Sequence, residues 1–269
     1  MMYFLLLFFG VLAGVTTVLF GFGGGFVVVP VLYSVLLATY GIDSEVGRAA
    51  MHIAVATSTC VMIFGAGMAT LRHHQARTVP WAQVRPLLGY IALGAVPGAA
   101  AALALSGDWV RWAFIGYLGL TILDSLLRPG FTKETSARIH PLGRLATAAI
   151  GAAIGAIAAF LGVGGSVMTV PLMRRRGASM TAATAAANPL SLPMAVVGSA
   201  TYALLAWSAT PLDAWHLGFI DLRACLVLMA GSWLGIRVTS RWIGKIPDGI
   251  HAKAYIALLC LVLAVMLVV

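Results

Sequence analysis

Long stretches without a charged side chain are the feature that most limits how this chain can fold. A helix needs roughly 20 mostly apolar residues to cross about 30 Å of hydrocarbon. Of the 269 residues, 61% are hydrophobic and 9% are charged, which is too apolar for a water-soluble globule. We therefore predict an all-α polytopic membrane protein whose spans lie within the uncharged runs 3–20, 49–71, 87–107, 112–123, 145–173, 177–212, 224–236 and 254–269.

The positive charges are unevenly distributed along the chain. Fourteen of the 17 Lys and Arg residues fall into four clusters between apolar runs, and the other three, Arg48, Arg111 and Arg223, lie near acidic residues. Because Lys and Arg accumulate in cytoplasmic loops, the net charge of +9 indicates topology and not a nucleic-acid partner. We expect the N- and C-termini on the outer side and the four clusters on the cytoplasmic side: 72–85, 128–144, 174–176 and 237–253.

The sequence repeats itself in two halves. The phrase GFGGGFVVVP at 21–30 returns as GVGGSVMTVP at 162–171, and Ser58 after the first phrase aligns with Ser191 after the second. In each half a pair of arms meets at a bend in the glycine phrase and returns to the same side. Three full crossings remain per half, and this odd number inverts the second half. We predict two inverted repeats, each with a broken re-entrant helix pair plus three full transmembrane helices, in one membrane domain: a first repeat at 1–127, a basic cytoplasmic linker at 128–144 and a second repeat at 145–269.

Each glycine phrase predicts an interruption of the helix inside the membrane. Consecutive glycines are poor helix interior. Proline restricts the residue before it and suits the first helical position, so we expect residues 26–29 and 167–170 to be extended, with helices beginning at Pro30 and Pro171. Non-helical backbone survives in a membrane only where protein buries it or where it lines a watery cavity. The two interruptions are therefore candidate binding sites.

Freed N–H groups and the positive end of a helix dipole attract anions at such a break. Polar residues of the helix that follows each break, counted from the helix end, lie about 12–16 Å deep, near the middle of the bilayer. Two breaks that enter from opposite faces can then meet in one pocket. The candidate substrate-binding residues are Gly23, Gly24, Gly25, Phe26, Thr57, Ser58, Gly164, Gly165, Ser166, Val167, Asn188 and Ser191.

The doubled phrases at 21–30 and 162–171, with the tripeptide Ala-Thr-Ser at 56–58, resemble the TauE/SafE family of sulfite exporters. The resemblance extends over essentially the whole chain. It implies a transporter of the bacterial cytoplasmic membrane that moves sulfite, sulfonates such as sulfoacetate, or related organosulfur anions. The second half departs from the family pattern at two places, and both bear on which anion is the substrate. Ser166 replaces the third consecutive glycine, and Asn188 begins Asn-Pro-Leu-Ser where the first half has Ala-Thr-Ser.

Other interpretations of these residues stay open. The solute can be another small anion such as a carboxylate, the glycines can serve close helix packing, and the hydroxyls can bond to their own helix. A cation or metal channel needs buried carboxylates, whereas Asp124, the one acidic residue within a span, lies at its end. An intramembrane enzyme with Ser166 as nucleophile needs a base at that depth, and the spans offer no histidine there. We expect no enzyme activity, no cofactor and no metal site, and the oligomeric state stays open.

Ionisable residues near the span ends have several possible roles. His52 lies about one turn inside the outer face, where it can be a proton relay or an interfacial side chain with satisfied hydrogen bonds. His73 and His74 are placed in a solvated basic loop without a role. Asp124 and Arg128 form an i, i+4 pair that we expect to anchor the inner interface.

Overall fold

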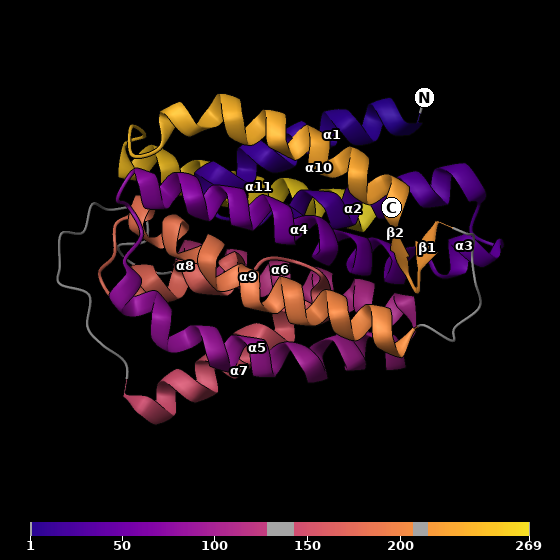
Figure 1. Cartoon of the computed structure of the whole chain (residues 1–269), viewed down its shortest axis with the longest axis horizontal. Helices are drawn as coiled ribbons and strands as arrows, with labels where there is room; N and C mark the ends of the chain where they lie inside the picture. Colours follow the sequence, from indigo (N-terminus) through magenta and orange to yellow (C-terminus); the bar gives the residue numbers. More distant parts are fainter. Residues whose placement is uncertain (1, 128–142, 207–214, 269) are drawn as a thin grey trace.

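The structure is a computed structural model that describes residues 2–127, 143–206 and 215–268. Its long helices run roughly along one common direction (Figure 1). A short antiparallel hairpin, β1 (His216–Leu217) with β2 (Ile220–Asp221), precedes α10. The helices are α1 (Met2–Phe20), α2 (Gly25–Tyr40), α3 (Glu45–Arg48), α4 (Ala50–Gln75), α5 (Trp81–Ala104), α6 (Gly107–Leu127), α7 (Arg144–Leu161), α8 (Ser166–Arg175), α9 (Met180–Leu205), α10 (Leu222–Thr239), the 3-10 helix η1 (Ser240–Trp242) and α11 (Asp248–Val268).

Eight helices in the described part of the chain are long and apolar enough to cross a membrane: α1, α4, α5, α6, α7, α9, α10 and α11. The predicted all-α polytopic fold is therefore confirmed. The shorter α2 and α8 have 16 and 10 residues. Their partners α1 and α7, expected as the first arm of each bent pair, have 19 and 18 residues and are long enough to cross by themselves. Each half thus combines one long and one short helix around its glycine phrase with three further long helices.

The chain leaves helical geometry at both glycine phrases, between α1 and α2 and between α7 and α8. Gly24 has a φ of +92° and Gly162 a φ of +65°, in the left-handed region that residues with a Cβ atom rarely adopt. The predicted interruption of the helix is therefore confirmed in both halves.

The prediction that residues 26–29 and 167–170 are extended is wrong. Both segments are helical, and Pro30 and Pro171 lie inside α2 and α8. Each proline is the sixth residue of its helix, so its missing N–H removes one hydrogen bond in the second turn. Both prolines are buried where α2 packs on α4 and α8 packs on α9, and neighbouring helices allow a proline within a membrane helix. The glycines alone interrupt the helix, and it resumes directly after them.

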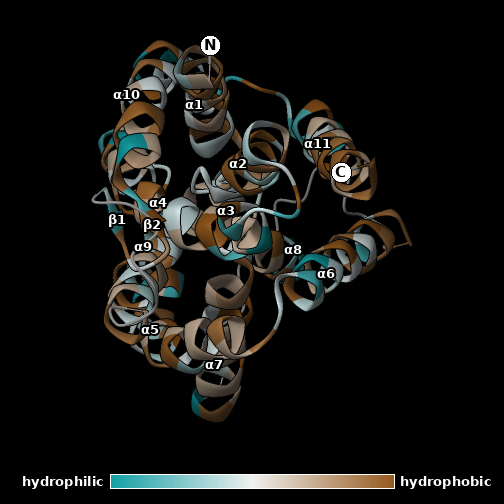
Figure 2. Ribbon diagram, turned by 90° about the vertical axis from the view of Figure 1, so that its right-hand side faces the viewer, coloured by the Kyte–Doolittle hydropathy of each residue, from teal (hydrophilic) through white to brown (hydrophobic). Residues whose placement is uncertain are grey.

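The helices of the two halves pack in exchanged pairs, in which the first helix of one half contacts the second-to-last long helix of the other half. α1 runs parallel to α10 and contacts it along its length, and α7 contacts α5 in the same way. Figure 2 shows the first pair at one side of the molecule and the second pair at the opposite side. Between them α4 contacts α9, while α2 packs on α4 and α8 packs on α9. The contact of α1 with α10 thus corresponds to that of α7 with α5, and the contact of α2 with α4 corresponds to that of α8 with α9.

Small residues allow the paired helices to approach closely. A Cβ atom added at Gly98 of α5 meets the backbone of Ala156 on α7, and one added at Gly14 of α1 meets the backbone of Ser232 on α10. Such contacts are typical of helix packing in membranes, where backbones approach over small residues. Gly116 on α6, by contrast, has open space around it.

Gly98→Ala should lower the free energy of unfolding by about 1–3 kcal/mol, because the added methyl group forces α5 and α7 apart. Gly116→Ala makes the same exchange in a long helix with no atom within 4 Å. This control should keep or slightly raise the stability, since alanine favours helix. Thermal unfolding in detergent measures both variants, and equal melting temperatures would contradict the packing described.

The described basic clusters lie at one end of the bundle. His73 near the end of α4 and His251 near the start of α11 both contact the last turn of α1, and Arg174 pairs with Asp248 close by. This basic end is at the left in Figure 1, whereas α1 begins and α11 ends at the opposite end. Residues 128–142 of the second cluster lie outside the described residues. The opposite end carries Arg48, Arg111 and Arg223.

The excess of positive charge predicts that the basic end faces the cytoplasm. In a background in which the three cysteines are replaced by serine, Asp43→Cys should react with a membrane-impermeant maleimide in intact cells. Lys245→Cys should react only after the cells are opened. Both side chains are exposed and lie at opposite ends of the molecule. The reverse labelling pattern would place the basic end outside.

Candidate functional site

The two glycine breaks contact each other inside the bundle, between α4 and α9. A Cβ atom added at Gly25 would lie 2.5 Å from the carbonyl oxygen of Gly162, and one added at Gly164 would lie 2.8 Å from that of Phe22. Side chains do not fit at such distances from backbone, so this contact requires glycine. Segments from opposite halves therefore form one packed unit, termed the glycine junction and defined as residues 21–25 and 162–166.

The two helices that begin at the glycine junction, α2 and α8, both have uncapped N-termini. Neither has a side-chain hydrogen bond at its N-cap residue, which is Gly24 in α2 and Gly165 in α8. The first N–H groups of a helix have no partner within the helix, and the helix dipole adds partial positive charge at this end. Two such ends in one packed region favour an anion.

Hydroxyl groups surround the glycine junction. Ser58 on α4 donates to the carbonyl oxygen of Gly162 at 2.7 Å. Ser191 on α9 donates to a carbonyl of its own helix at 2.9 Å, and its oxygen lies beside Gly164. Ser166, the first residue of α8, is fully buried and its hydroxyl has no hydrogen-bond partner among the described residues. A buried hydroxyl without a partner costs free energy, so the Ser166 hydroxyl is available to a ligand.

The described side chains closest to the junction glycines are uncharged. They belong to Thr17, Val55, Ser58, Met62, Ile154, Thr169, Ala187 and Ser191. A nearby carboxylate would repel an anion, and a buried Lys or Arg would hold it strongly. An anion at the glycine junction would instead be held by helix dipoles and hydroxyl groups.

Three side chains from other helices donate to carbonyl groups at the end of α1, where the Thr17 carbonyl also accepts from the Gly21 N–H at 3.0 Å. The carbonyl oxygens of residues 17–19 accept, in order, from Asn188 Nδ2 at 3.1 Å, His73 Nε2 at 2.8 Å and His251 Nε2 at 2.6 Å. The last carbonyls of a helix have no partner within it, so these bonds stabilise the end of α1. Asn188 thus acts here on the backbone, and its remaining Oδ1 atom is an acceptor, which does not favour an anion.

The prediction that His73 lies in a solvated loop is wrong. Its side chain is 2% exposed, because the free carbonyl of Val18 needs a buried donor. His74 is exposed, as expected, and accepts from Trp81 Nε1 at 3.1 Å. Sequence reasoning missed His251 altogether. It lies in the basic segment 237–253, before the uncharged run 254–269 begins, so the signal that singled out His52 does not find it.

The hairpin of β1 and β2 covers part of α4 away from the basic end. The backbone N–H of Asp221 donates to Thr57 Oγ1 at 2.9 Å, and the ring of Phe219 stacks on His52 at 5.3 Å. His52 Nε2 lies 2.9 Å from the carbonyl oxygen of Leu105, just past the end of α5. In this structure Thr57 therefore binds the hairpin, and His52 is a partly exposed side chain with a satisfied hydrogen bond.

Three further candidates lie in the glycine junction or directly next to it in sequence. Phe26 is buried and stacks on Phe22 at 4.3 Å. Gly165 approaches Ile154 of α7. Val167 points away from the junction, since it lines a groove of about 450 Å³ between α6, α7 and α8.

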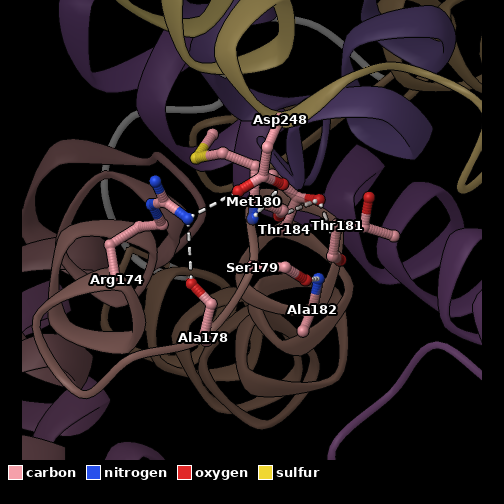
Figure 3. A network of polar contacts seen from close by, with 8 residues as sticks. All are labelled: Arg174, Ala178, Ser179, Met180, Thr181, Ala182, Thr184 and Asp248. Atoms are coloured by element: carbon pink, nitrogen blue, oxygen red, sulfur yellow. Dashed lines mark hydrogen bonds and ion pairs between the residues drawn. The ribbon is translucent and has the colours of Figure 1, made fainter. Parts of the chain in front are cut away.

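A polar network closes the basic end (Figure 3). Asp248 at the start of α11 accepts from Arg174 at 2.7 Å and from the backbone N–H of Met180 at 2.8 Å. Arg174 also donates to the carbonyl oxygen of Ala178 at 3.0 Å. One carboxylate thereby joins the end of α8, the start of α9 and the start of α11.

The expected pair of Asp124 with Arg128 lies partly outside the described residues, because the structure does not describe Arg128. Asp124 forms an ion pair with Arg175 at 2.7 Å, so the end of α6 is joined to the end of α8. The expected anchoring role thus involves a residue 51 positions further along the chain.

These features define a multi-pass helical membrane protein with two helix breaks in direct contact. The family model "Sulfite exporter TauE/SafE" matches residues 6–267. The chain belongs to this family of membrane transporters, and the family resemblance of its glycine phrases is confirmed.

Two relatives have names that agree with this class. A "Probable membrane transporter protein" of Haemophilus influenzae is 26% identical over 259 residues, which cover 95% of this chain and 94% of the relative. The "Probable membrane transporter protein MamO" of Paramagnetospirillum magneticum is 26% identical over 232 residues. That match covers 74% of this chain but 35% of MamO, so the chain corresponds to about a third of that longer protein.

Asn188→Ala should lower the free energy of unfolding by about 1–2 kcal/mol, because it removes a buried hydrogen bond at the end of α1 and leaves a small cavity. Ser191→Ala, three residues further along α9, removes a hydroxyl that bonds its own helix, and its effect should be smaller. Thermal unfolding in detergent compares the two. Wild-type stability in Asn188→Ala would contradict the capping role.

Proposed function

We propose that this protein transports sulfite, sulfonates such as sulfoacetate, or related organosulfur anions across the bacterial cytoplasmic membrane. The glycine junction is the proposed binding site, near the middle of the bilayer. The observation that carries the proposal is the contact between the two breaks, which brings two uncapped helix N-termini and the hydroxyls of Ser58 and Ser166 into one uncharged region. The family name supports a sulfur anion, and the free helix ends support negative charge.

The available donors suit an oxyanion. A sulfite or sulfonate group presents several oxygen acceptors, which the Ser166 hydroxyl and the first N–H groups of α2 and α8 can bind. A site without a fixed positive charge binds such a group weakly, and a carrier needs to release its solute. We therefore assign Ser166 as a direct ligand, and Ser58 as the residue that fixes the Gly162 carbonyl and shapes the junction.

The proposed transport mechanism is alternating exposure of the glycine junction. In this proposal residues 1–127 and 145–269 form two inverted repeats joined by a cytoplasmic linker at 128–144. The exchanged pairs α1–α10 and α7–α5 support this division. So do the directions of the first helices, since α1 begins at one end of the molecule and α7 begins at the other (Figure 1).

The polar contacts at the two ends suggest where access is controlled. At the basic end, the Asp248 network joins α8, α9 and α11. At the opposite end, the backbone N–H of Asp221 in the hairpin donates to Thr57 of α4. We propose that these two contacts open in turn while the glycine junction stays packed between α4 and α9.

Transport by the purified protein in proteoliposomes tests the proposed substrate class. Sulfite or a sulfonate should enter faster than in protein-free liposomes and faster than acetate, because the junction donors match several acceptor oxygens. Uptake of acetate alone would make the substrate a carboxylate. Absence of flux for every anion would contradict an anion transporter.

Ser166→Ala should raise the KM for a transported sulfonate about tenfold, because loss of one hydrogen bond costs about 1–1.5 kcal/mol. Ser34→Ala is the matched control on α2, since the Ser34 hydroxyl donates to the Pro30 carbonyl of its own helix at 2.7 Å. Its KM should match that of the wild type. An unchanged KM in Ser166→Ala would contradict the assignment of this hydroxyl as a ligand.

A further inference from the structure

His251 and His73 lie together at the basic end, against the last turn of α1. Their side chains are 4% and 2% exposed. Each Nε2 atom faces a backbone carbonyl, which can only accept, so each Nε2 carries a proton. Both rings line a cavity of about 10 Å³ with Thr181 and Thr184, which is room for about one water molecule. Two buried ionisable rings and a water-sized space thus stand beside the first glycine break.

The second nitrogen of each ring has a different environment. His73 Nδ1 lies 2.8 Å from the hydroxyl of Thr78. That hydroxyl also lies 3.1 Å from the His73 carbonyl, so it can donate to either group. His251 Nδ1 is buried and has no hydrogen-bond partner among the described residues. A buried acceptor without a donor is costly, and a proton bound at this atom would turn it into a donor.

The charged and titratable groups that face His251 in the described chain come from three elements. Arg174 approaches from α8, Asp248 lies on its own helix α11, and His73 approaches from α4. The residues that α1, α9 and the α10–α11 connection contribute to the cavity are uncharged. Burial is the largest of these effects and opposes an imidazolium here, as does Arg174, whereas the hydrogen bond to the Leu19 carbonyl and the carboxylate of Asp248 favour it.

A proton on His251 would act on the contact that closes the basic end. Asp248 and His251 are three residues apart on α11, a spacing that places them on one face of the helix. Asp248 at present accepts from Arg174 and from the N–H of Met180. An imidazolium beside it competes for the same carboxylate oxygens. Protonation therefore weakens the connection of α11 to α8 and α9.

We infer that His251 is a proton-binding residue that couples protons to anion movement. The proton binds to Nδ1 from the water-sized cavity and leaves from the same atom, and no other bond is made or broken. Binding favours an open basic end, and release favours the closed end in this structure. The coupling to anions rests on the proposed function, whereas proton binding itself does not.

His251→Gln tests the inference, because glutamine can still donate an N–H toward the Leu19 carbonyl but cannot titrate. His52→Gln is the matched control. Its ring also lies against backbone carbonyls at a helix end, those of Ala102 and Leu105, but at the opposite end of the molecule. If His251→Gln does not fold, His251→Asn replaces it in every measurement.

The transport measurement uses proteoliposomes and a sulfonate, whose own charge does not change between about pH 5 and pH 8, the range in which histidine titrates. In the wild type a pH gradient should drive accumulation of the sulfonate. His251→Gln should lose this accumulation and keep the exchange of labelled sulfonate at equal pH, and His52→Gln should keep both. Accumulation by His251→Gln at the wild-type level would overturn the inference, as would its loss in His52→Gln alone.

A second measurement does not depend on transport. The melting temperature of the detergent-solubilised wild type should fall when the pH is lowered from about 8 to about 5, because protonation of His251 weakens the closed basic end. The shift should be smaller in His251→Gln and unchanged in His52→Gln. If the wild type moves no anion, the proposed function fails, and this profile alone decides the proton site. Identical profiles in the wild type and His251→Gln would overturn it.

Discussion

The contact between two glycine segments is the constraint on which the rest of the structure depends. Gly25 and Gly164 each lie against backbone of the opposite break, so no side chain fits between the halves at this point. Two helices must therefore end at the glycine junction and two others must begin there. The beginnings present free N–H groups and partial positive charge to the junction, whereas the ends present carbonyls. The proposed preference for anions and the need for caps have this common origin.

The carbonyl groups at the end of α1 explain why polar side chains are buried in an otherwise apolar bundle. Asn188, His73 and His251 come from three different helices and converge on one turn of α1. They hold that turn against α4, α9 and α11, beside the carboxylate of Asp248 that joins α8, α9 and α11. The side chains that stabilise the end of α1 are therefore neighbours of the carboxylate that closes the basic end. A change of charge at His251 affects Asp248 for this reason.

The sequence predicted the features that depend on local composition. Uncharged runs predicted the spans, and consecutive glycines predicted the interruptions. The repeat predicted that Ser58, Ser191 and the glycines lie in one region. Features set by distant contacts were not predictable. The local preference of Pro30 and Pro171 against a preceding helix is overridden by burial on α4 and α9. His73 is buried where it donates to a carbonyl 55 residues away in sequence, and Thr57 accepts from a hairpin N–H 164 residues away.

A map of the purified protein with a saturating sulfonate, obtained by electron cryo-microscopy, tests the central claim most directly. The sulfonate should lie at the glycine junction, between the first residues of α2 and α8, with an oxygen within hydrogen-bonding distance of the Ser166 hydroxyl. A sulfonate bound elsewhere, such as in the groove between α6, α7 and α8, with the junction unchanged and empty, would contradict an anion site built from the two broken helices.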